Sequence, residues 1–373
     1  MNNFVKTTLF GALLAGSIIN ISSAELRPCY AQECAAAISV SDLAIEHETK
    51  FGGAYLKMTI EDFNKAGFNY GDSLNITFSN GKKVEDVPFY NGYYTKVGGL
   101  LVVGYPGYPY IKIAKNYGSD TFEEFELNEN VTATITLNEA KKYLTNQETF
   151  SLAYSKNRQD YESDVVFANF RAMKGGSMKE NNFYRSASPC CNDCNRAPYV
   201  DRFLQKNLVS FVLDLSDSAE DIVEFKKNGN YRTPYFDALN SHDRVAFLDM
   251  GANYQSDAFK HSLVRGLREL IGHKGPYLTH CIEGKDRTGF VCILLEELCG
   301  ATEDEMKTDY MITYKNYYGI TEDNNPDKYN AIVNLHFNSM YSYIRSVGGA
   351  KEYLKSGGMT DAEIVKLMYR LID

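Results

Sequence analysis

The sequence predicts two folded domains of different class: a small antiparallel β domain, barrel or sandwich, followed by a larger α/β domain. Three observations predict this. The length of 373 residues is that of two ordinary domains. Residues 67–137 contain runs that alternate apolar and polar residues as strands do, whereas strand-like and helix-like segments alternate from about residue 160 onward. The apolar fraction of 44% excludes a disordered chain.

The β domain is expected over residues 41–155, after an N-terminal segment at 25–40. Ser73–Phe78 and Val131–Leu137 alternate, and Asn80-Gly81 after the first run is a hairpin turn signal. The stretch 91–118 between the two runs is rich in Tyr and Gly. We interpret its tyrosines as cross-strand aromatic pairs, and a surface that binds sugars or peptides is the alternative.

Residues 1–24 have the features of a signal peptide. Lys6 is followed by an apolar stretch, Leu9–Ile21, which is too short to span a bilayer, and small residues then lead to a cleavage site near Ala24. We therefore expect an exported protein, periplasmic or secreted. An uncleaved N-terminal anchor is the alternative.

Export affects how the cysteines are interpreted, because an oxidising compartment favours disulfides. Two groups lie close enough in sequence to form them: Cys29 with Cys34, and the cluster Cys190, Cys191 and Cys194. A zinc site at that cluster is the alternative, but its fourth ligand would have to come from far along the chain. Cys292 and Cys299 lie in an apolar helical stretch and are expected to be buried and reduced.

The α/β domain is expected over residues 156–373. Val209–Leu215 is an apolar run of buried-strand length, and His261–Ile271 has apolar residues at helical spacing. Tyr277–His280 is predicted to be a short strand, and Thr288–Leu298 a buried helix closed by Gly300.

The segment between that strand and that helix reads His280-Cys281-Ile282-Glu283-Gly284-Lys285-Asp286-Arg287-Thr288-Gly289. A tight strand-to-helix turn presents several backbone N–H groups and the positive end of a helix dipole at one point, which is an anion cradle. Five residues between Cys281 and Arg287 are enough for a loop to wrap a tetrahedral anion, with the sulfur beneath it and the guanidinium over two of its oxygens. Such surroundings stabilise a thiolate, so Cys281 is predicted to be a nucleophile.

This loop resembles the signature loop of the Cys-dependent tyrosine and dual-specificity phosphatases, and most of all that of the bacterial branch whose loop reads Gly-Lys-Asp-Arg-Thr-Gly. The resemblance extends over residues 160–373 and rests also on four other segments: Asn169-Phe170-Arg171 with Phe183–Ala187, Val212–Leu215 with Glu220, Gly348–Leu354, and Met359–Ile364. It implies a tyrosine-phosphatase-like central sheet flanked by helices. It also implies phosphorylated proteins or peptides as substrates, with phosphoinositides in some members.

The resemblance implies covalent phosphoryl transfer without a metal or cofactor. Cys281 would attack phosphorus, and Arg287 with the N–H groups of the loop would hold the phosphate oxygens. The phosphate-binding residues would be Ile282, Glu283, Gly284, Lys285, Thr288 and Gly289. Thr288 could donate its hydroxyl to the sulfur, and His280 could support the loop from below.

Two carboxylates compete as the general acid. Asp286 lies inside the loop beside Arg287, where the matching branch is thought to keep its acid. Asp249 follows an apolar run and precedes Cys281 by a spacing that resembles the separate acid loop of other tyrosine phosphatases. We favour Asp286, because an acid must first be within reach of the leaving oxygen.

Two residues depart from the branch. Ser216 stands where an Arg is usual after Asp-Leu, and Glu283 stands in the loop where a small residue is usual. A carboxylate there would repel phosphate or would pair with Lys285. Either outcome weakens a phosphoinositide substrate and affects phosphotyrosine least.

Three function classes follow. The first is an exported phosphotyrosine phosphatase, with broader phosphomonoester or phosphoinositide activity as a variant. The second is a phosphate-sensing module without turnover, and the third is sulfur transfer by a rhodanese-type loop. The net charge of −9 argues against nucleic acid as a partner.

Overall fold

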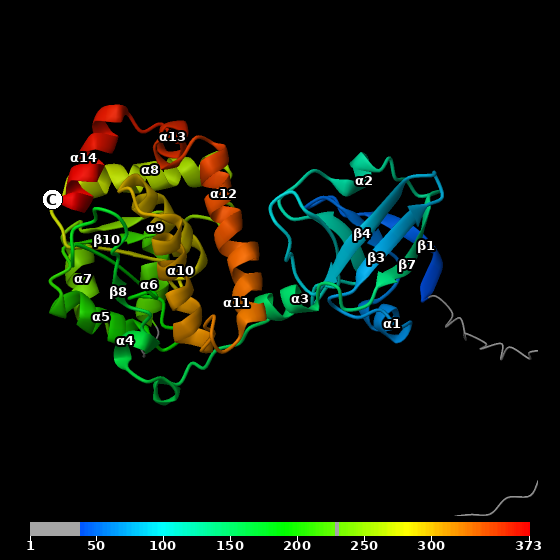
Figure 1. Cartoon of the computed structure of the whole chain (residues 1–373), viewed down its shortest axis with the longest axis horizontal. Coiled ribbons are helices and arrows are strands. Elements are labelled where there is room, and N and C mark those ends of the chain that lie inside the picture. The colour runs from blue at the N-terminus through cyan, green and yellow to red at the C-terminus, as the bar shows by residue number, and fades with distance from the viewer. Residues whose placement is uncertain (1–37, 228–230) are drawn as a thin grey trace, which may run out of the picture. The chain divides into compact units, whose positions relative to one another are not determined.

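The computed structural model describes residues 38–227 and 231–373 (Figure 1). The expected signal peptide, Cys29 and Cys34 lie outside the described residues. No helix in the described part of the chain is both long enough and apolar enough to cross a membrane.

The N-terminal domain is a closed barrel. The predicted β class is therefore confirmed, and of the two predicted forms, barrel and sandwich, it is the barrel. Its strands run in the order β1-β2-β6-β5-β4-β3-β7 (Figure 1). Their pairing is antiparallel except between β4 and β5, which are parallel. The strands are β1 (Ser39–His47), β2 (Ala54–Leu56), β3 (Ser73–Phe78), β4 (Lys83–Tyr90), β5 (Leu100–Val103), β6 (Ile111–Lys115) and β7 (Thr132–Glu139). Short helices accompany them: α1 (Ile60–Lys65), α2 (Thr121–Glu124) and α3 (Leu144–Phe150).

The barrel interior is filled by the apolar residues of the alternating strands, such as Leu74, Ile76 and Ile135. The Tyr-rich stretch forms β5 and β6 with their flanking turns. Its tyrosines pack on one another, and the hydroxyls of Tyr93 and Tyr108 lie 3.1 Å apart, but these two residues lie in the turns beside the strands and not on paired strands as predicted.

The second domain is built on a five-stranded sheet in the order β11-β10-β12-β9-β8. Its strands are β8 (Arg171–Ala172), β9 (Phe183–Ser186), β10 (Phe211–Asp214), β11 (Val245–Phe247) and β12 (Tyr277–His280). β9, β12, β10 and β11 are parallel, and β8 is antiparallel to β9. The carboxyl ends of four neighbouring strands therefore meet at one edge of the sheet.

Helices cover both faces of this sheet (Figure 1). Phe211 and Leu213 of β10 pack in one apolar cluster, and Val212 between them packs in another. This alternation explains why the strand reads as a continuous apolar run. The helices are α4 (Asp164–Phe167), α5 (Ala197–Lys206), α6 (Ala219–Lys227), α7 (Pro234–Ser241), α8 (Asp257–Ile271), α9 (Asp286–Leu298), α10 (Glu303–Tyr318), α11 (Pro326–Ile332), α12 (Asn338–Ser346), α13 (Ala350–Ser356) and α14 (Asp361–Ile372), with a 3-10 turn at Arg158–Asp160 and a π-helical turn at Val333–Phe337.

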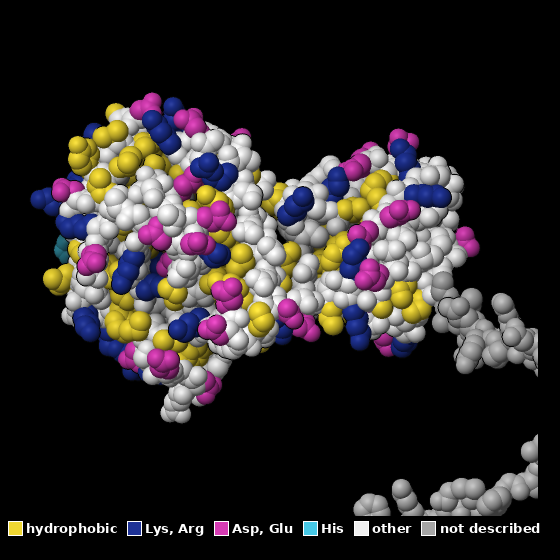
Figure 2. All heavy atoms as spheres, in the orientation of Figure 1, with side chains coloured by type: hydrophobic (Ala, Val, Ile, Leu, Met, Phe, Trp, Pro, Cys, Tyr) yellow, Lys and Arg dark blue, Asp and Glu magenta, His cyan; other side chains and the backbone are white. Residues whose placement is uncertain are grey.

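The strand and helix predicted around the loop are confirmed, and the helix begins at Asp286, two residues earlier than expected. Figure 2 shows acidic and basic side chains intermixed over the visible face. The net negative charge is therefore not gathered into one patch on that face, and the attraction of an anionic substrate depends on local groups.

Candidate active site

The loop lies between β12 and α9, at the edge of the sheet where the parallel strands end. Cys281 follows the last residue of β12 and is 4% exposed. Ile282, next to it, is exposed. The thiol therefore sits at the bottom of the turn, as a nucleophile beneath a bound anion would.

Gly284 is required by the path of the loop. Its φ is +67°, a left-handed conformation that favours glycine. A Cβ at this position would lie 2.1 Å from the carbonyl oxygen of Ser186. The loop thus packs its backbone directly against the end of β9.

Three successive carbonyl groups of the loop are bonded to the surrounding protein. The carbonyl of Ile282 accepts from the Ser188 N–H at 3.1 Å, and that of Glu283 accepts from the Tyr317 hydroxyl at 2.6 Å. The carbonyl of Gly284 accepts from Arg185 Nη2 at 2.9 Å. The backbone of the loop is therefore held from outside through its acceptors.

The donors of the same backbone are free. Among the described residues, no acceptor is hydrogen-bonded to the N–H groups of residues 282–285. The first N–H groups of α9 follow directly, and a helix leaves these without an intrahelical partner. This run of N–H groups beside Cys281 is suited to bind an anion.

Arg185 braces the loop and does not face it as a substrate ligand would. It is fully buried, and its Nη1 lies 2.5 Å from Asp309 Oδ2. Arg171 Nε lies 2.7 Å from the other oxygen of Asp309. Burial alone would raise the pKa of Asp309, but the two guanidinium groups outweigh it and hold this pKa below its usual value.

Arg287 is the second residue of α9, and its Nη1 donates to the carbonyl of Met250 at 2.8 Å. This bond connects the loop to the segment after β11, which carries Asp249. Asp249 is exposed and has a φ of +44°. Asp286 is the first residue of α9, and its half-exposed side chain lies 3.7 Å from Lys285 Nζ.

Glu283 forms an ion pair with Lys285, as one of the two predicted alternatives required. Its Oε2 lies 3.2 Å from Lys285 Nζ, and its Oε1 accepts from the Tyr154 hydroxyl at 2.7 Å. Burial alone would lower the pKa of Lys285, but Asp286 and Glu283 raise it well above its usual value. Lys285 is thus charged and partly neutralised by the residue beside it.

Beneath the loop lies a buried group of polar side chains. Burial lowers the pKa of His280 to about 4, so the ring is neutral near pH 7. Burial raises the pKa of Asp214 to about 6, and burial with the neighbouring charge of Asp214 raises that of Asp217 to about 7. Thr288 is also buried, and its hydroxyl has no hydrogen-bond partner among the described residues.

The prediction of a disulfide within the cluster Cys190, Cys191 and Cys194 is wrong, because all three are free thiols. Their side chains point to different partners. Cys190 Sγ lies 3.6 Å from Asp214 Oδ2, whereas Cys194 Sγ lies 3.3 Å from the Tyr154 hydroxyl. Closeness in sequence therefore did not bring the sulfur atoms together. Cys292 and Cys299 are buried free thiols, as expected.

Three residues around the loop were not foreseen. Tyr154 and Tyr317 bond directly to Glu283, whereas Asp309 pairs with Arg185, which in turn bonds to the loop. Asp309 and Tyr317 lie on one face of α10, and Tyr154 precedes the first helix of the domain. No short motif marks them, because each contact depends on the packing of a distant segment against the loop.

Comparison with known proteins agrees with this geometry. Residues 167–373, more than half of the chain, match the family described as "Tyrosine phosphatase family". The chain belongs to the tyrosine phosphatase family. It is thus a hydrolase of phosphoric esters, and the matched part contains the whole loop and the sheet beneath it.

Two similar proteins can be named. The "Triple specificity protein phosphatase PtpB" of Mycobacterium tuberculosis is 32% identical over 104 residues, which are 26% of this chain and 38% of that protein. The matched segment therefore spans well under half of that relative. The core catalytic domain of the PP-IP phosphatase SIW14 from S. cerevisiae covers 50% of this chain and 94% of its own, with 16% identity and a TM-score of 0.26.

Proposed function

We propose that this protein is an exported phosphatase that hydrolyses phosphotyrosine through a phosphocysteine intermediate on Cys281. The observation that carries the proposal is the run of N–H groups at residues 282–285 beside the buried thiol, which have no acceptor among the described residues, whereas the carbonyls of residues 282–284 are held from outside. Donors arranged in advance stabilise the charge of a transferring phosphoryl group without reorganising during the reaction.

In the first step, Cys281 Sγ attacks phosphorus while the bond from phosphorus to the tyrosine oxygen breaks. The leaving phenolate takes a proton from Asp286 or, as the alternative acid, from Asp249. In the second step, water attacks phosphorus and the S–P bond breaks, which releases inorganic phosphate and the thiolate. The unpaired hydroxyl of Thr288 is available to donate to the departing sulfur.

Arg287 would hold two oxygens of the phosphate. Its Nη1 is bonded to the Met250 carbonyl, which restricts the guanidinium to one orientation. Nε and Nη2 then remain for a bidentate contact. The same bond keeps the segment with Asp249 close to the loop, so the structure is compatible with either acid.

The pair of Glu283 and Lys285 favours a substrate with a single phosphate. Lys285 would otherwise attract a second phosphate, but Glu283 lies 3.2 Å away and offsets its charge. Phosphotyrosine carries one phosphate and places no charge beside this pair. The broader specificity in the name of PtpB makes a phosphoinositide or dual-specificity activity the alternative.

A panel of phosphotyrosine peptides, phosphoserine peptides and phosphoinositides, assayed on the natural chain and on Glu283→Ala, tests the substrate class. We expect the natural chain to prefer phosphotyrosine. Removing one charge near a second phosphate is worth about 1–2 kcal/mol at intermediate dielectric, so the variant should gain about tenfold on phosphoinositides. An unchanged ranking would contradict the role of Glu283. Phosphate binding without turnover of any substrate would favour the sensing module, and transfer of sulfur from thiosulfate to cyanide would favour the rhodanese-type reaction.

Export is tested separately. If the protein is recovered from the periplasm or the medium of its host, N-terminal sequencing should find a mature chain that begins near Glu25. Retention of residues 1–24 on the recovered protein would contradict cleavage near Ala24.

A further inference from the structure

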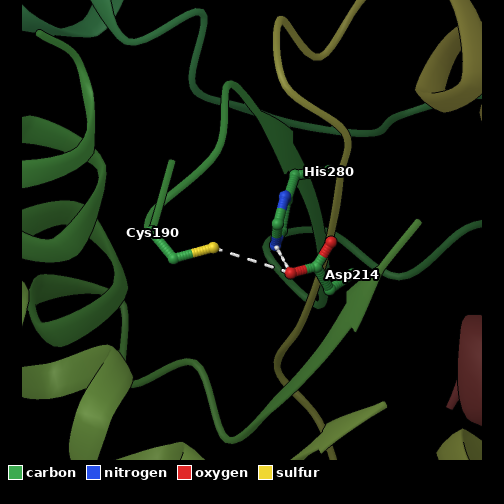
Figure 3. A group of neighbouring side chains, drawn as sticks. All are labelled: Cys190, Asp214 and His280. Atoms are coloured by element: carbon green, nitrogen blue, oxygen red, sulfur yellow. Dashed lines mark hydrogen bonds and ion pairs between the residues drawn. The ribbon is translucent and has the colours of Figure 1, made fainter. Parts of the chain in front are cut away.

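Three side chains from distant parts of the sequence meet directly beneath the nucleophile. Asp214 is the last residue of β10, His280 is the last residue of β12, and Cys190 lies in the loop that follows β9. These three strands are parallel neighbours in the sheet, so their carboxyl ends converge. Figure 3 shows the sulfur, one carboxylate oxygen and the imidazole ring pointing toward one another. We call these residues the Cys190 cluster.

The spacing within the Cys190 cluster is that of metal ligands. Cys190 Sγ lies 3.6 Å and His280 Nε2 lies 3.7 Å from Asp214 Oδ2, and all three ligand atoms lie within 4.8 Å of one another. Hydrogen bonds between nitrogen and oxygen span about 2.7–3.2 Å, so the separation of His280 and Asp214 is too long for one. In a tetrahedral zinc site with metal–ligand bonds of about 2.0–2.3 Å, neighbouring ligand atoms are about 3.3–3.7 Å apart.

The cluster also contains polar groups whose burial is not compensated. His280 is fully buried, and neither ring nitrogen has a hydrogen-bond partner of ordinary geometry among the described residues. Leaving a buried donor or acceptor unsatisfied costs about 1–3 kcal/mol. The ring points into the cluster, so a ligand placed there would satisfy Nε2 (Figure 3).

The carboxylates beside His280 lack a cationic partner. Asp214 and Asp217 are buried, and no Lys or Arg in the described part of the chain forms an ion pair with either. Oδ1 of Asp214 accepts from the N–H groups of Ser216 and Asp217, which leaves Oδ2 directed at Cys190 and His280. Among the described residues, Asp214 Oδ2 accepts its hydrogen bond from the Cys190 thiol, and a metal ion could take the place of that thiol proton between the two groups.

We propose that the Cys190 cluster binds one divalent transition-metal ion of the zinc type, with Cys190 Sγ, Asp214 Oδ2 and His280 Nε2 as ligands. Sulfur, imidazole nitrogen and carboxylate oxygen together suit zinc better than magnesium or calcium, which take oxygen ligands. Asp217, whose Oδ2 lies 3.5 Å from Cys190 Sγ, is the nearest side chain for a fourth ligand. On binding, the Cys190 thiol releases its proton to solvent and the sulfur donates as thiolate.

This ion would have a structural role and would take no part in the phosphatase reaction. It would join three neighbouring strand ends and fix His280, the residue covalently attached to Cys281. The inference goes beyond the proposed phosphatase activity, because the ligand group consists of Cys190, Asp214 and His280 and includes neither Cys281 nor Arg287. The proposed site also differs from the zinc site considered from the sequence. Of the three clustered cysteines it includes only Cys190, and its other ligands come from the ends of β10 and β12.

The test uses the full chain with Cys281→Ser, so that the nucleophile cannot bind the metal. Because the ligands are buried, the protein is refolded either with one equivalent of Zn²⁺ or with a chelator, desalted, and analysed for metal. A parallel sample is refolded with Co²⁺ and its absorption spectrum recorded. Each measurement is repeated with Cys190→Ser and with Cys191→Ser, which removes the adjacent thiol outside the cluster.

We expect about one zinc per folded chain and, with cobalt, a sulfur-to-metal charge-transfer band with the intense visible absorption of a tetrahedral site. Cys190→Ser should abolish the charge-transfer band, and Cys191→Ser should keep it. The proposal would be overturned if Cys190→Ser and Cys191→Ser gave charge-transfer bands of equal intensity. It would also be overturned if the Cys281→Ser chain, with the Cys190 cluster intact, folded in the presence of zinc and retained no metal. Should Cys190→Ser fail to fold, the zinc content and cobalt spectrum of the Cys281→Ser chain decide the question alone. Phosphatase activity enters none of these readouts, so a failure here is distinct from a failure of the proposed function.

Discussion

Replacing Gly284 by alanine should damage the active-site loop far more than it damages the fold. The Cβ of Gly284→Ala would lie 2.1 Å from the Ser186 carbonyl oxygen, where ordinary contacts begin at 3.4 Å. Ser186 pairs with His280 between β9 and β12, so the backbone of Ser186 cannot move away without disturbing the sheet. The loop must therefore move by about 1 Å, and a displacement of that size can reduce kcat about 100-fold.

The left-handed conformation adds a second cost. An alanine at a φ of +67° is destabilised by about 1–2 kcal/mol relative to its preferred conformations. Gly300 offers a matched control, because its φ is +80° and no atom lies within 4 Å of the position of its Cβ. Gly300→Ala should lose similar stability and keep its turnover.

The assay is the hydrolysis of p-nitrophenyl phosphate, with thermal unfolding measured on the same samples. We expect kcat of Gly284→Ala to fall about 100-fold, with a loss of stability at least as large as that of Gly300→Ala, whereas Gly300→Ala keeps the natural kcat. If Gly284→Ala keeps the natural kcat, or if Gly300→Ala loses as much activity, contact with β9 does not position the loop for catalysis.

Three further predictions concern the groups around the loop. Asp309→Asn leaves the buried guanidinium groups of Arg171 and Arg185 without their counter-charge, which should cost about 3–5 kcal/mol and lower Tm by about 10 °C. Since the folded state lowers the pKa of Asp309, its stabilising contribution is present above the unfolded pKa of about 4 and is lost as pH falls further, so the Tm difference between the two proteins should shrink in acid. Tyr317→Phe removes the 2.6 Å bond to the Glu283 carbonyl and should lower kcat/KM about tenfold, as a loss of about 1.4 kcal/mol would. Tyr353→Phe removes a similar bond to Tyr254 away from the loop, and equal activity losses in the two variants would contradict a specific role of Tyr317. Asp286→Asn should remove the basic limb of the pH profile for aryl phosphate turnover, and Asp249→Asn should keep it. The reverse result would identify Asp249 as the general acid. If neither variant loses the basic limb, neither residue is the general acid.

The parts of the fold that could be predicted are those with local signals. Alternation marked the strands of the barrel, and an apolar run followed by a Gly-containing turn and a helical stretch marked β12, the loop and α9. Closure of the barrel could not be predicted, because it depends on β1 pairing with both β2 and β7. Pairing of such distant segments leaves no local pattern.

The same distinction explains the site. Cys281 and Arg287 belong to one short segment, so their spacing alone indicated an anion loop. The brace formed by Arg185 and Asp309 joins β9 to α10 and was not visible as a pair. The disulfide prediction for the three clustered cysteines was wrong because sequence spacing carries no information on side-chain direction, and Cys190 instead points to the end of β10.

Direct detection of the phosphorylated nucleophile tests the central claim that Cys281 performs covalent catalysis. The protein is mixed rapidly with p-nitrophenyl phosphate, quenched in acid and digested for mass spectrometry, alongside Cys281→Ser. We predict that the natural chain gains one phosphoryl group on the peptide that contains Cys281, and that the variant neither gains it nor turns over substrate. A phosphoryl group on another residue, or undiminished turnover by Cys281→Ser, would contradict this account.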